Sequence, residues 1–146
     1  MTNEAVGPRS SESVIRTLSA AECYELLAVA AVGRIGFGSP AGIEIIPVNY
    51  RSAGDRVMFR TVPGGRLAQL ADSDGHVAFE VDYHASDFVI AWSVLMHGEV
   101  SRLDAEGEVL LSNLRHPRLA WPGADHTLAL QFVPHDISGR SLMRRA

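Results

Sequence analysis

The sequence contains no lysine, and all 13 of its basic residues are arginine. Without a lysine amine the chain cannot form a Schiff base with a carbonyl substrate or with pyridoxal phosphate. It also lacks the lysine of a phosphate-binding loop. Any phosphate that a side-chain charge holds must therefore be held by arginine, whose planar guanidinium suits bidentate contacts.

Cysteine and long apolar runs are also scarce. The single cysteine, Cys23, excludes an internal disulfide and a thiolate metal cluster, and it indicates a reducing compartment. The longest strongly apolar run, residues 26–32, is far shorter than the roughly 20 residues that a membrane span needs. The polar N-terminus does not have the layout of a signal peptide. We therefore expect a cytoplasmic protein that does not associate with membranes.

The charge balance is mildly acidic, with a net charge of −4 and a pI near 5.8. No basic field draws the protein to nucleic acid or to anionic lipid, so neither is an expected partner. A chain of 146 residues with 47% hydrophobic and 21% charged residues corresponds to one globular domain. We expect this domain over residues 17–146, preceded by a disordered lead-in over residues 1–16.

A capped helix is predicted at the start of the domain. Ser19 is a favourable N-cap residue, and Glu22, three residues later, completes a capping box. Apolar residues then follow at helical spacing. The helix is expected to end at Gly33.

From residue 34 onward the pattern turns to β-strands. Strands are expected over residues 34–38, 43–51, 56–61 and 76–83, as a long strand or bent pair over 88–103, and as two strands split around Pro134 over 127–145. Pro47 indicates an edge position or a bulge, because proline cannot donate a hydrogen bond to a neighbouring strand. Short helices are expected over 66–74 and 104–116, and a loop over 117–126. This order predicts a mainly β protein, an antiparallel barrel with a few short flanking helices.

Common catalytic and metal-binding motifs are missing. The sequence has no G-x-G-x-x-G after a strand, no G-x-S-x-G and no H-E-x-x-H. Among its six histidines, His84 with Asp82, or His135 with Asp136, could contribute to a metal site. Solvated loop residues are the commoner alternative, and we assign no metal site and no catalytic residue.

The segment over residues 59–67 gathers groups that favour an anion. A strand ends in Arg60 and Thr61, the chain turns through Pro-Gly-Gly, and Arg66 opens a helix. Two guanidinium groups, a hydroxyl, glycine N–H groups and a helix N-terminus therefore occupy one region, and each of them favours phosphate. The alternative is an ordinary turn with solvated arginines.

Two further segments are candidates for binding a planar ligand. The predicted edge strand around Pro47 leaves backbone groups free, and Asn49 offers both a donor and an acceptor, so a ring could lie along it. Trp92 could form one wall of a flat pocket. An ordinary edge strand and a core or interface aromatic are the respective alternatives.

Six motifs follow one another along the chain: E-C-x-E-L-L-A (22–28), V-G-R-I (32–35), I-P-V-N-Y (46–50), F-R-T-x-P-G-x-R-L (59–67), V-A-F-E-V-D (77–82) and W-S-V-x-x-x-G (92–98). In this order and spacing they resemble the pyridoxamine 5′-phosphate oxidase-like proteins, and most closely their short actinobacterial members. The similarity extends to I-S-G-R (137–140), which resembles a common closing strand.

This resemblance implies a split β-barrel that forms a homodimer, with a flavin in each of two clefts at the subunit interface. The cofactor-binding residues that it implies fall into three groups. The phosphate would be held by Arg60, Thr61 and Arg66, with the backbone of Gly64 and Gly65 and the adjoining Leu67. The isoalloxazine ring would be lined by Pro47, Val48 and Asn49, and approached from the interface strand by Trp92 and Ser93.

The expected function is that of a flavin-dependent oxidoreductase acting on an unknown small molecule. FMN is the first expectation for the cofactor, a deazaflavin the second, and haem a less favoured third. The chemistry would belong to the cofactor, so no side chain has to be an acid or a base. A non-catalytic flavin or haem carrier on the same barrel is the main alternative, followed by a cofactor-free interaction module.

Overall fold

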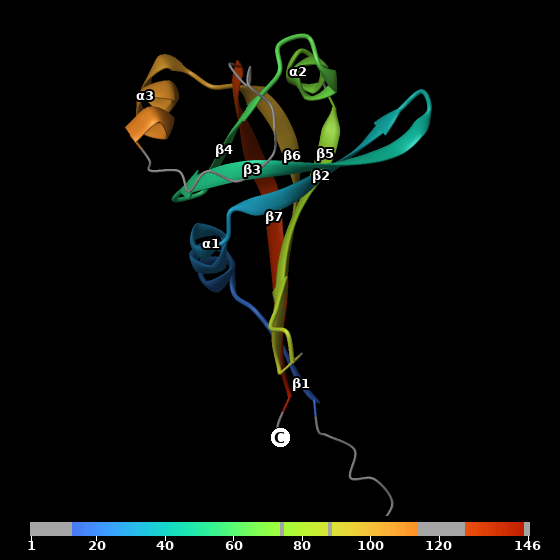
Figure 1. Ribbon diagram of the computed structural model, residues 1–146, viewed down its shortest axis with the longest axis vertical. Coiled ribbons are helices and arrows are strands. Elements are labelled where there is room, and N and C mark those ends of the chain that lie inside the picture. The colour runs from blue at the N-terminus through green and yellow to red at the C-terminus, as the bar shows by residue number, and fades with distance from the viewer. Residues whose placement is uncertain (1–12, 74, 88, 114–127, 145–146) are drawn as a thin grey trace, which may run out of the picture.

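An antiparallel sheet that closes on itself forms the body of the protein. The computed structural model describes residues 13–73, 75–87, 89–113 and 128–144. Its seven strands are β1 (Ser13–Thr17), β2 (Val32–Ser39), β3 (Gly42–Ala53), β4 (Arg56–Thr61), β5 (His76–His84), β6 (Ile90–Arg102) and β7 (Leu128–Arg144). They lie in the order β1-β7-β4-β3-β2-β5-β6, and β6 also pairs with β7, so that six of them close a barrel (Figure 1). The predicted antiparallel barrel is confirmed.

Strand β7 is one continuous strand of 17 residues and not the two strands expected on either side of Pro134. Opposite it on β6 the register shifts between His97 and Gly98, which pair with Asp136 and Pro134. This irregularity lets the sheet pass a residue that has no N–H to donate. Strand β6 is likewise continuous over 13 residues.

The sheet begins earlier in the chain than predicted, at Ser13. Residues 13–16, expected to be disordered, belong to β1, which pairs with the end of β7 from Ser13↔Arg144 to Thr17↔Arg140. Val14 and Ile15 are β-branched and therefore suit a strand. The remaining residues of the predicted lead-in, 1–12, lie outside the described part of the chain.

Helix α1 (Ala20–Val29) has the predicted N-terminus and a different C-terminus. The Glu22 amide donates to Ser19 Oγ at 3.2 Å, and the Ser19 amide donates to Glu22 Oε1 at 3.1 Å, which confirms the capping box. The helix ends at Val29 and not at Gly33. Gly33 lies in β2, where a Cβ atom would be 2.4 Å from the Phe79 ring. This glycine therefore serves the close approach of β2 to the core.

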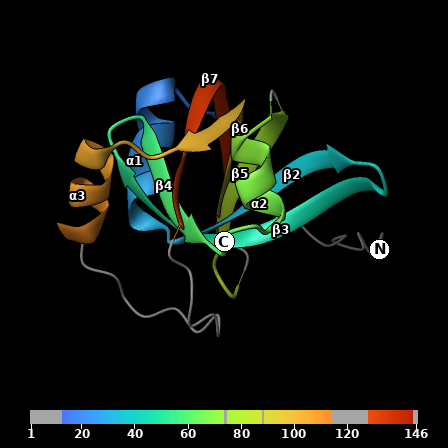
Figure 2. The ribbon, with the colours of Figure 1, turned by 90° about the horizontal axis from the view of Figure 1, so that it is seen from above.

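Three aromatic side chains, Phe59, Phe79 and Phe132, lie fully buried inside the barrel. Helix α1 packs on one end of this core, where Gly139 makes room for Cys23: a Cβ on the glycine would be 2.7 Å from the cysteine sulfur. Helix α2 (Arg66–Ala71) and helix α3 (Ala105–Asn113) flank the sheet elsewhere (Figure 2). Helix α2 is shorter than predicted, and α3 begins one residue later than predicted. The end of the helix predicted over 104–116 and the predicted loop over 117–126 lie outside the described residues. No helix in the described part of the chain has the length and apolar character to cross a membrane.

The hairpin of β2 and β3 extends beyond the barrel as a projecting arm, which we define as residues 36–49 (Figures 1 and 2). Within the described residues, this part of β3 pairs with β2 alone, because β4 pairs only with residues 50–53. Pro47 therefore lies on an edge, as predicted. Ile43 and Ile45 on the arm are 84% and 67% exposed.

Candidate functional site

The strand–turn–helix unit predicted around Arg66 is present. Strand β4 ends at Thr61, the chain turns with Gly64 at φ +75°, and α2 begins at Arg66. A side chain at Gly64 would be strained, because positive φ is a region that residues with a Cβ rarely adopt. The Gly65 amide donates to the Val62 carbonyl at 3.2 Å, which tightens the turn.

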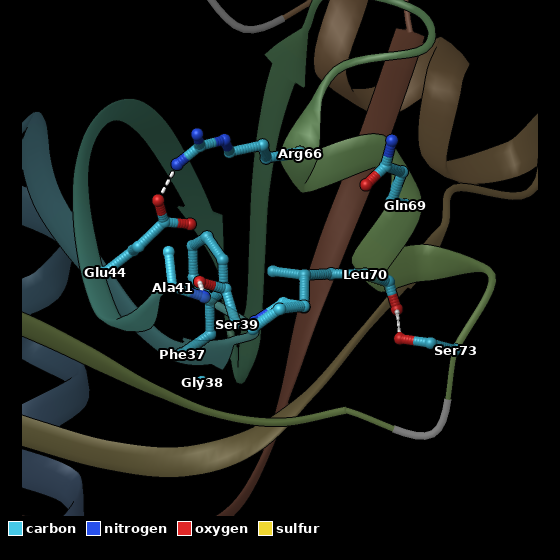
Figure 3. A pocket seen from close by; sticks show the side chains of 10 residues that line it. Phe37, Gly38, Ser39, Ala41, Glu44, Arg66, Gln69, Leu70 and Ser73 are labelled. Atoms are coloured by element: carbon cyan, nitrogen blue, oxygen red, sulfur yellow. Dashed lines mark hydrogen bonds and ion pairs between the residues drawn. The ribbon is translucent and has the colours of Figure 1, made fainter.

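Arg66 points from α2 toward the arm, where it forms an ion pair with Glu44 (Figure 3). The Arg66 side chain is 63% exposed and that of Glu44 is 19% exposed. The second carboxylate oxygen of Glu44, Oε2, is buried and has no hydrogen-bond partner in the described structure. Glu44 was not among the predicted site residues. It could have been found as the single acidic residue among apolar neighbours on the inward face of its strand, with Ile46 and Val48.

A cavity of about 420 Å³ lies between the arm and α2. Arg66 and Glu44 are at its margin, and apolar and uncharged polar side chains make up the rest (Figure 3). Its lining consists of Phe37, Gly38, Ser39, Pro40, Ala41, Glu44, Arg66, Gln69, Leu70 and Ser73. A concave site of this size is within the range of small-molecule pockets.

Arg60 lies at the other side of the same turn and points elsewhere. Its Nη2 donates to Ser112 Oγ of α3 at 3.3 Å. The two predicted phosphate-binding arginines thus start from one short segment and contact different elements. Leu67 is 5% exposed and packs in the core, so that only its backbone remains available to a ligand.

The segment predicted to line a planar ring has one buried acceptor without a hydrogen-bond partner. Val48 is buried in the core, whereas Pro47 is exposed and Asn49 is half-buried. The Asn49 Oδ1 atom is buried and has no hydrogen-bond partner among the described residues. A buried acceptor without a hydrogen bond lowers the stability of the protein by about 1–3 kcal/mol. A ligand that donates a hydrogen bond to it would remove this cost.

Trp92 and Ser93 are not brought next to this segment within one chain. They lie on β6, and strands β2 and β5 separate β6 from β3 in the sheet. Trp92 stacks on Tyr83 with ring centroids 6.3 Å apart, and Ser93 is in register with Asp82 and Arg140. These residues border a separate cavity of about 360 Å³.

A second charged cluster, which the sequence reasoning missed, spans β2 and β5. Arg34 Nη1 lies 3.0 Å from Glu80 Oε2 and 3.3 Å from Asp82 Oδ2. Burial raises the pKa of Glu80 to about 7, and the neighbouring Asp82 adds to the shift. The pKa of Asp82 is lowered, chiefly by the hydrogen bond from Glu80 and then by Arg34. The sequence did contain a signal for this cluster, because Glu80 and Asp82 are acidic residues at alternate positions of one predicted strand.

Of the histidine pairs considered for a metal, His84 stays near Asp82 and adds to the lowering of its pKa, whereas His135 and Asp136 contact different residues. Asp136 accepts from the backbone of His97 and contacts its ring, with Nδ1 2.9 Å from Oδ1, while His135 faces Glu99 at 4.0 Å. Over the described residues, no group of three or more histidine, cysteine, aspartate or glutamate side chains is placed to hold a metal ion.

The chain is similar to a known protein family and to several solved structures. The family model described as pyridoxamine 5′-phosphate oxidase matches residues 19–141. A solved structure of the FAD binding protein from Mycobacterium smegmatis is 28% identical, with a TM-score of 0.64 over 88% of this chain and 98% of that one. No curated protein matches the chain.

Two more distant structures share the fold. A FAD-binding protein from Mesorhizobium loti is 22% identical, with a TM-score of 0.71 over 90% of this chain and 98% of that one. The FAD and heme binding protein from Mycobacterium smegmatis is 16% identical, with a TM-score of 0.65 over 89% of this chain and 74% of that one.

Proposed function

Because the chain belongs to the pyridoxamine 5′-phosphate oxidase family, we propose that it binds a flavin and transfers hydride or electrons between that flavin and a small molecule. The observation that carries the proposal is the buried, unpartnered Oδ1 of Asn49. It lies in the strand segment that the family resemblance assigns to the isoalloxazine ring. The polar edge of that ring carries an N–H group, which is the type of donor that this oxygen lacks.

The residues around Arg66 fit the phosphate of a flavin. Arg66 is mostly exposed, so its guanidinium can exchange the Glu44 carboxylate for a phosphate, which carries more negative charge. Arg60 contributes a second positive charge from the same segment, and Thr61 adds a hydroxyl. The backbone amide of Gly64 supplies a further donor, and neither Gly64 nor Gly65 has a side chain that blocks the approach. The Gly65 amide itself donates to the Val62 carbonyl.

The proposed cofactor is a flavin nucleotide, with FMN as the expectation from the sequence. FMN and FAD share the isoalloxazine ring and the first phosphate, so both meet the requirements set by Asn49 and Arg66. The relative that is 28% identical is named as a FAD binding protein, which adds FAD to the candidates. A deazaflavin and haem remain the alternatives for the test below.

We further propose that the site is completed by a second copy of the chain. Trp92 and Ser93 are separated from Asn49 by two strands, so Trp92 and Ser93 of a second copy would have to close the cleft over the ring. Apolar side chains exposed on β1, β5 and the arm supply surface for such a contact: Ile15 is 68%, Tyr83 50% and Ile45 67% exposed.

When bound, the flavin supplies the hydride or electron transfer itself. The chain's own residues would bind and orient it: Arg60 and Arg66 would hold the phosphate end, Asn49 would accept a hydrogen bond from the ring, and Pro47 would lie beside the ring. Trp92 of a second copy would exclude water from the ring. None of these roles requires a protein acid or base.

The visible absorption spectrum of the freshly purified protein tests this function. It is recorded as isolated and after addition of FMN, FAD, a deazaflavin and haem in turn. A flavin spectrum, or saturable flavin binding, supports the proposal. Oxidation of a reduced nicotinamide in the presence of an electron acceptor then separates an oxidoreductase from a carrier, which would bind the flavin without turnover. Binding of haem alone, or of none of the four, would contradict the proposal.

A further inference from the structure

We infer that the cavity between the arm and α2 holds the adenosine half of FAD, so that this protein selects FAD over FMN. The inference rests on the proposed flavin binding and extends it, because FMN ends at its phosphate. FAD continues from that phosphate through a second phosphate and a ribose to an adenine base. The cavity begins at Arg66, the residue proposed to hold the first phosphate, and contains about 420 Å³.

The order of chemical groups in the cavity matches the order of groups in a nucleotide. Arg66 at the margin attracts an anion. Beyond it, Phe37, Pro40 and Leu70 provide apolar surface of the kind on which a flat base packs. Gln69 adds an amide that can both donate and accept at the polar edge of such a base. Figure 3 shows Leu70 pointing from α2 toward Phe37 of the arm, with Arg66 reaching toward Glu44 beside them.

Glu44 gives the most specific indication of the ligand. One of its oxygens pairs with Arg66, while the buried Oε2 has no partner in the described structure. This oxygen needs a hydrogen-bond donor and repels an anion. A ribose hydroxyl or the exocyclic amine of adenine is such a donor, and a phosphate is not. The cavity therefore fits the uncharged half of a nucleotide, with the phosphates kept at Arg66.

The directions of the two arginines agree with a two-part ligand. Arg60 points toward Ser112 of α3, and Arg66 points toward Glu44 of the arm, from opposite sides of one turn. A ligand that passes through this turn can place its ring system on one side and a second group on the other. A ligand that stops at its phosphate leaves the cavity beyond Arg66 unused.

The test compares the affinities of the full-length chain for FAD and FMN, followed by quenching of flavin fluorescence. We expect the unmodified protein to bind FAD at least tenfold more tightly than FMN. Ala41→Trp fills the cavity from the exposed turn of the arm and is expected to reduce FAD affinity about tenfold, to the level of FMN, while FMN affinity stays unchanged. Circular dichroism checks that this variant remains folded.

A matched variant on the same arm serves as the control. Ile43 is 84% exposed and does not line the cavity, so Ile43→Trp adds the same side chain without filling the space. It should keep the full preference for FAD. Equal affinities of the unmodified protein for the two flavins, or a full FAD preference in Ala41→Trp, would overturn the inference and leave the proposed flavin binding intact. Failure of the unmodified protein to bind either flavin would overturn both.

Discussion

Two of the places where arginine meets carboxylate differ in the number of carboxylates, one near α2 and the other on β2 and β5. Near α2, the single guanidinium of Arg66 faces the single carboxylate of Glu44 at the margin of a cavity. On β2 and β5, the single guanidinium of Arg34 is shared by Glu80 and Asp82. Both clusters use the same functional groups, yet the physical consequences are different.

The difference follows from how the charges balance. At Arg66 the pair is neutral and the arginine is 63% exposed, so an anion can replace the carboxylate at low cost. At Arg34 two carboxylates compete for one positive charge in a partly buried place, and one of them keeps its proton more readily. The first cluster is therefore suited to binding a phosphate, and the second to binding a proton.

The largest expected effect comes from removing the cation of the first cluster. Arg66→Ala should weaken flavin binding by roughly 10- to 100-fold, because charged hydrogen bonds contribute about 1.5–3 kcal/mol each. The protein should remain folded, since the Arg66 side chain is mostly exposed. Flavin titration and thermal unfolding of the variant measure the two quantities.

Arg102→Ala is the matched control for this variant. Arg102 also pairs with a carboxylate, Asp72 at 3.2 Å, and its side chain is 57% exposed, but it is not among the proposed site residues. Its flavin affinity should equal that of the unmodified protein. An unchanged flavin affinity in Arg66→Ala would show that Arg66 does not hold the flavin phosphate.

The second prediction concerns the carboxylates of the other cluster and the dependence of stability on pH. The pKa of Glu80 is raised from 4.5 to about 7 in the folded protein, so folding favours its protonated form. The free energy of unfolding should therefore decrease as pH rises between about 4.5 and about 7. Glu80→Gln removes this titration and should be more stable than the unmodified protein by about 1 kcal/mol at about pH 8, with no gain near pH 5.

Urea unfolding at several pH values measures this effect. The pKa of Asp82 is lowered from 3.8, so Asp82 titrates below pH 3.8 and does not contribute to the change in stability between about pH 4.5 and about pH 7. Asp82→Asn serves as a comparison: it removes the neighbouring charge, and the decrease in stability should shift to lower pH. Parallel pH profiles for Glu80→Gln and the unmodified protein would show that Glu80 does not bind this proton.

The smallest expected effect comes from the carboxylate of the first cluster. Glu44→Gln leaves Arg66 without its negative partner, and an ion pair whose arginine is mostly exposed contributes about 0.2–1 kcal/mol. The affinity for FMN should increase by about threefold, because the phosphate no longer has to displace a charge. Titration with FMN isolates this effect, since FMN ends at the phosphate. A weaker affinity would mean that Glu44 supports the phosphate site instead of competing with it.

Local sequence signals predicted the elements but not all of their ends. The capping box of Ser19 and Glu22 and the edge position of Pro47 both follow from neighbours in the chain, and the structure confirms them. The predicted helix end at Gly33 was wrong, because that glycine is required by the Phe79 ring of a distant strand. The predicted break at Pro134 was wrong because the pairing of β7 with β6 shifts by one residue beside the proline, and β7 continues past it.

By itself, the amino-acid sequence determined the strand pattern, the capped helix, the turn before Arg66 and the exclusive use of arginine for positive charge. These properties depend on residues a few positions apart, whose conformational preferences act locally. Only the tertiary structure decided that Glu44 meets Arg66 and that Arg34 lies between Glu80 and Asp82. The partners in each cluster are far apart in the chain, and the register of the strands and the position of α2 against the arm bring them together.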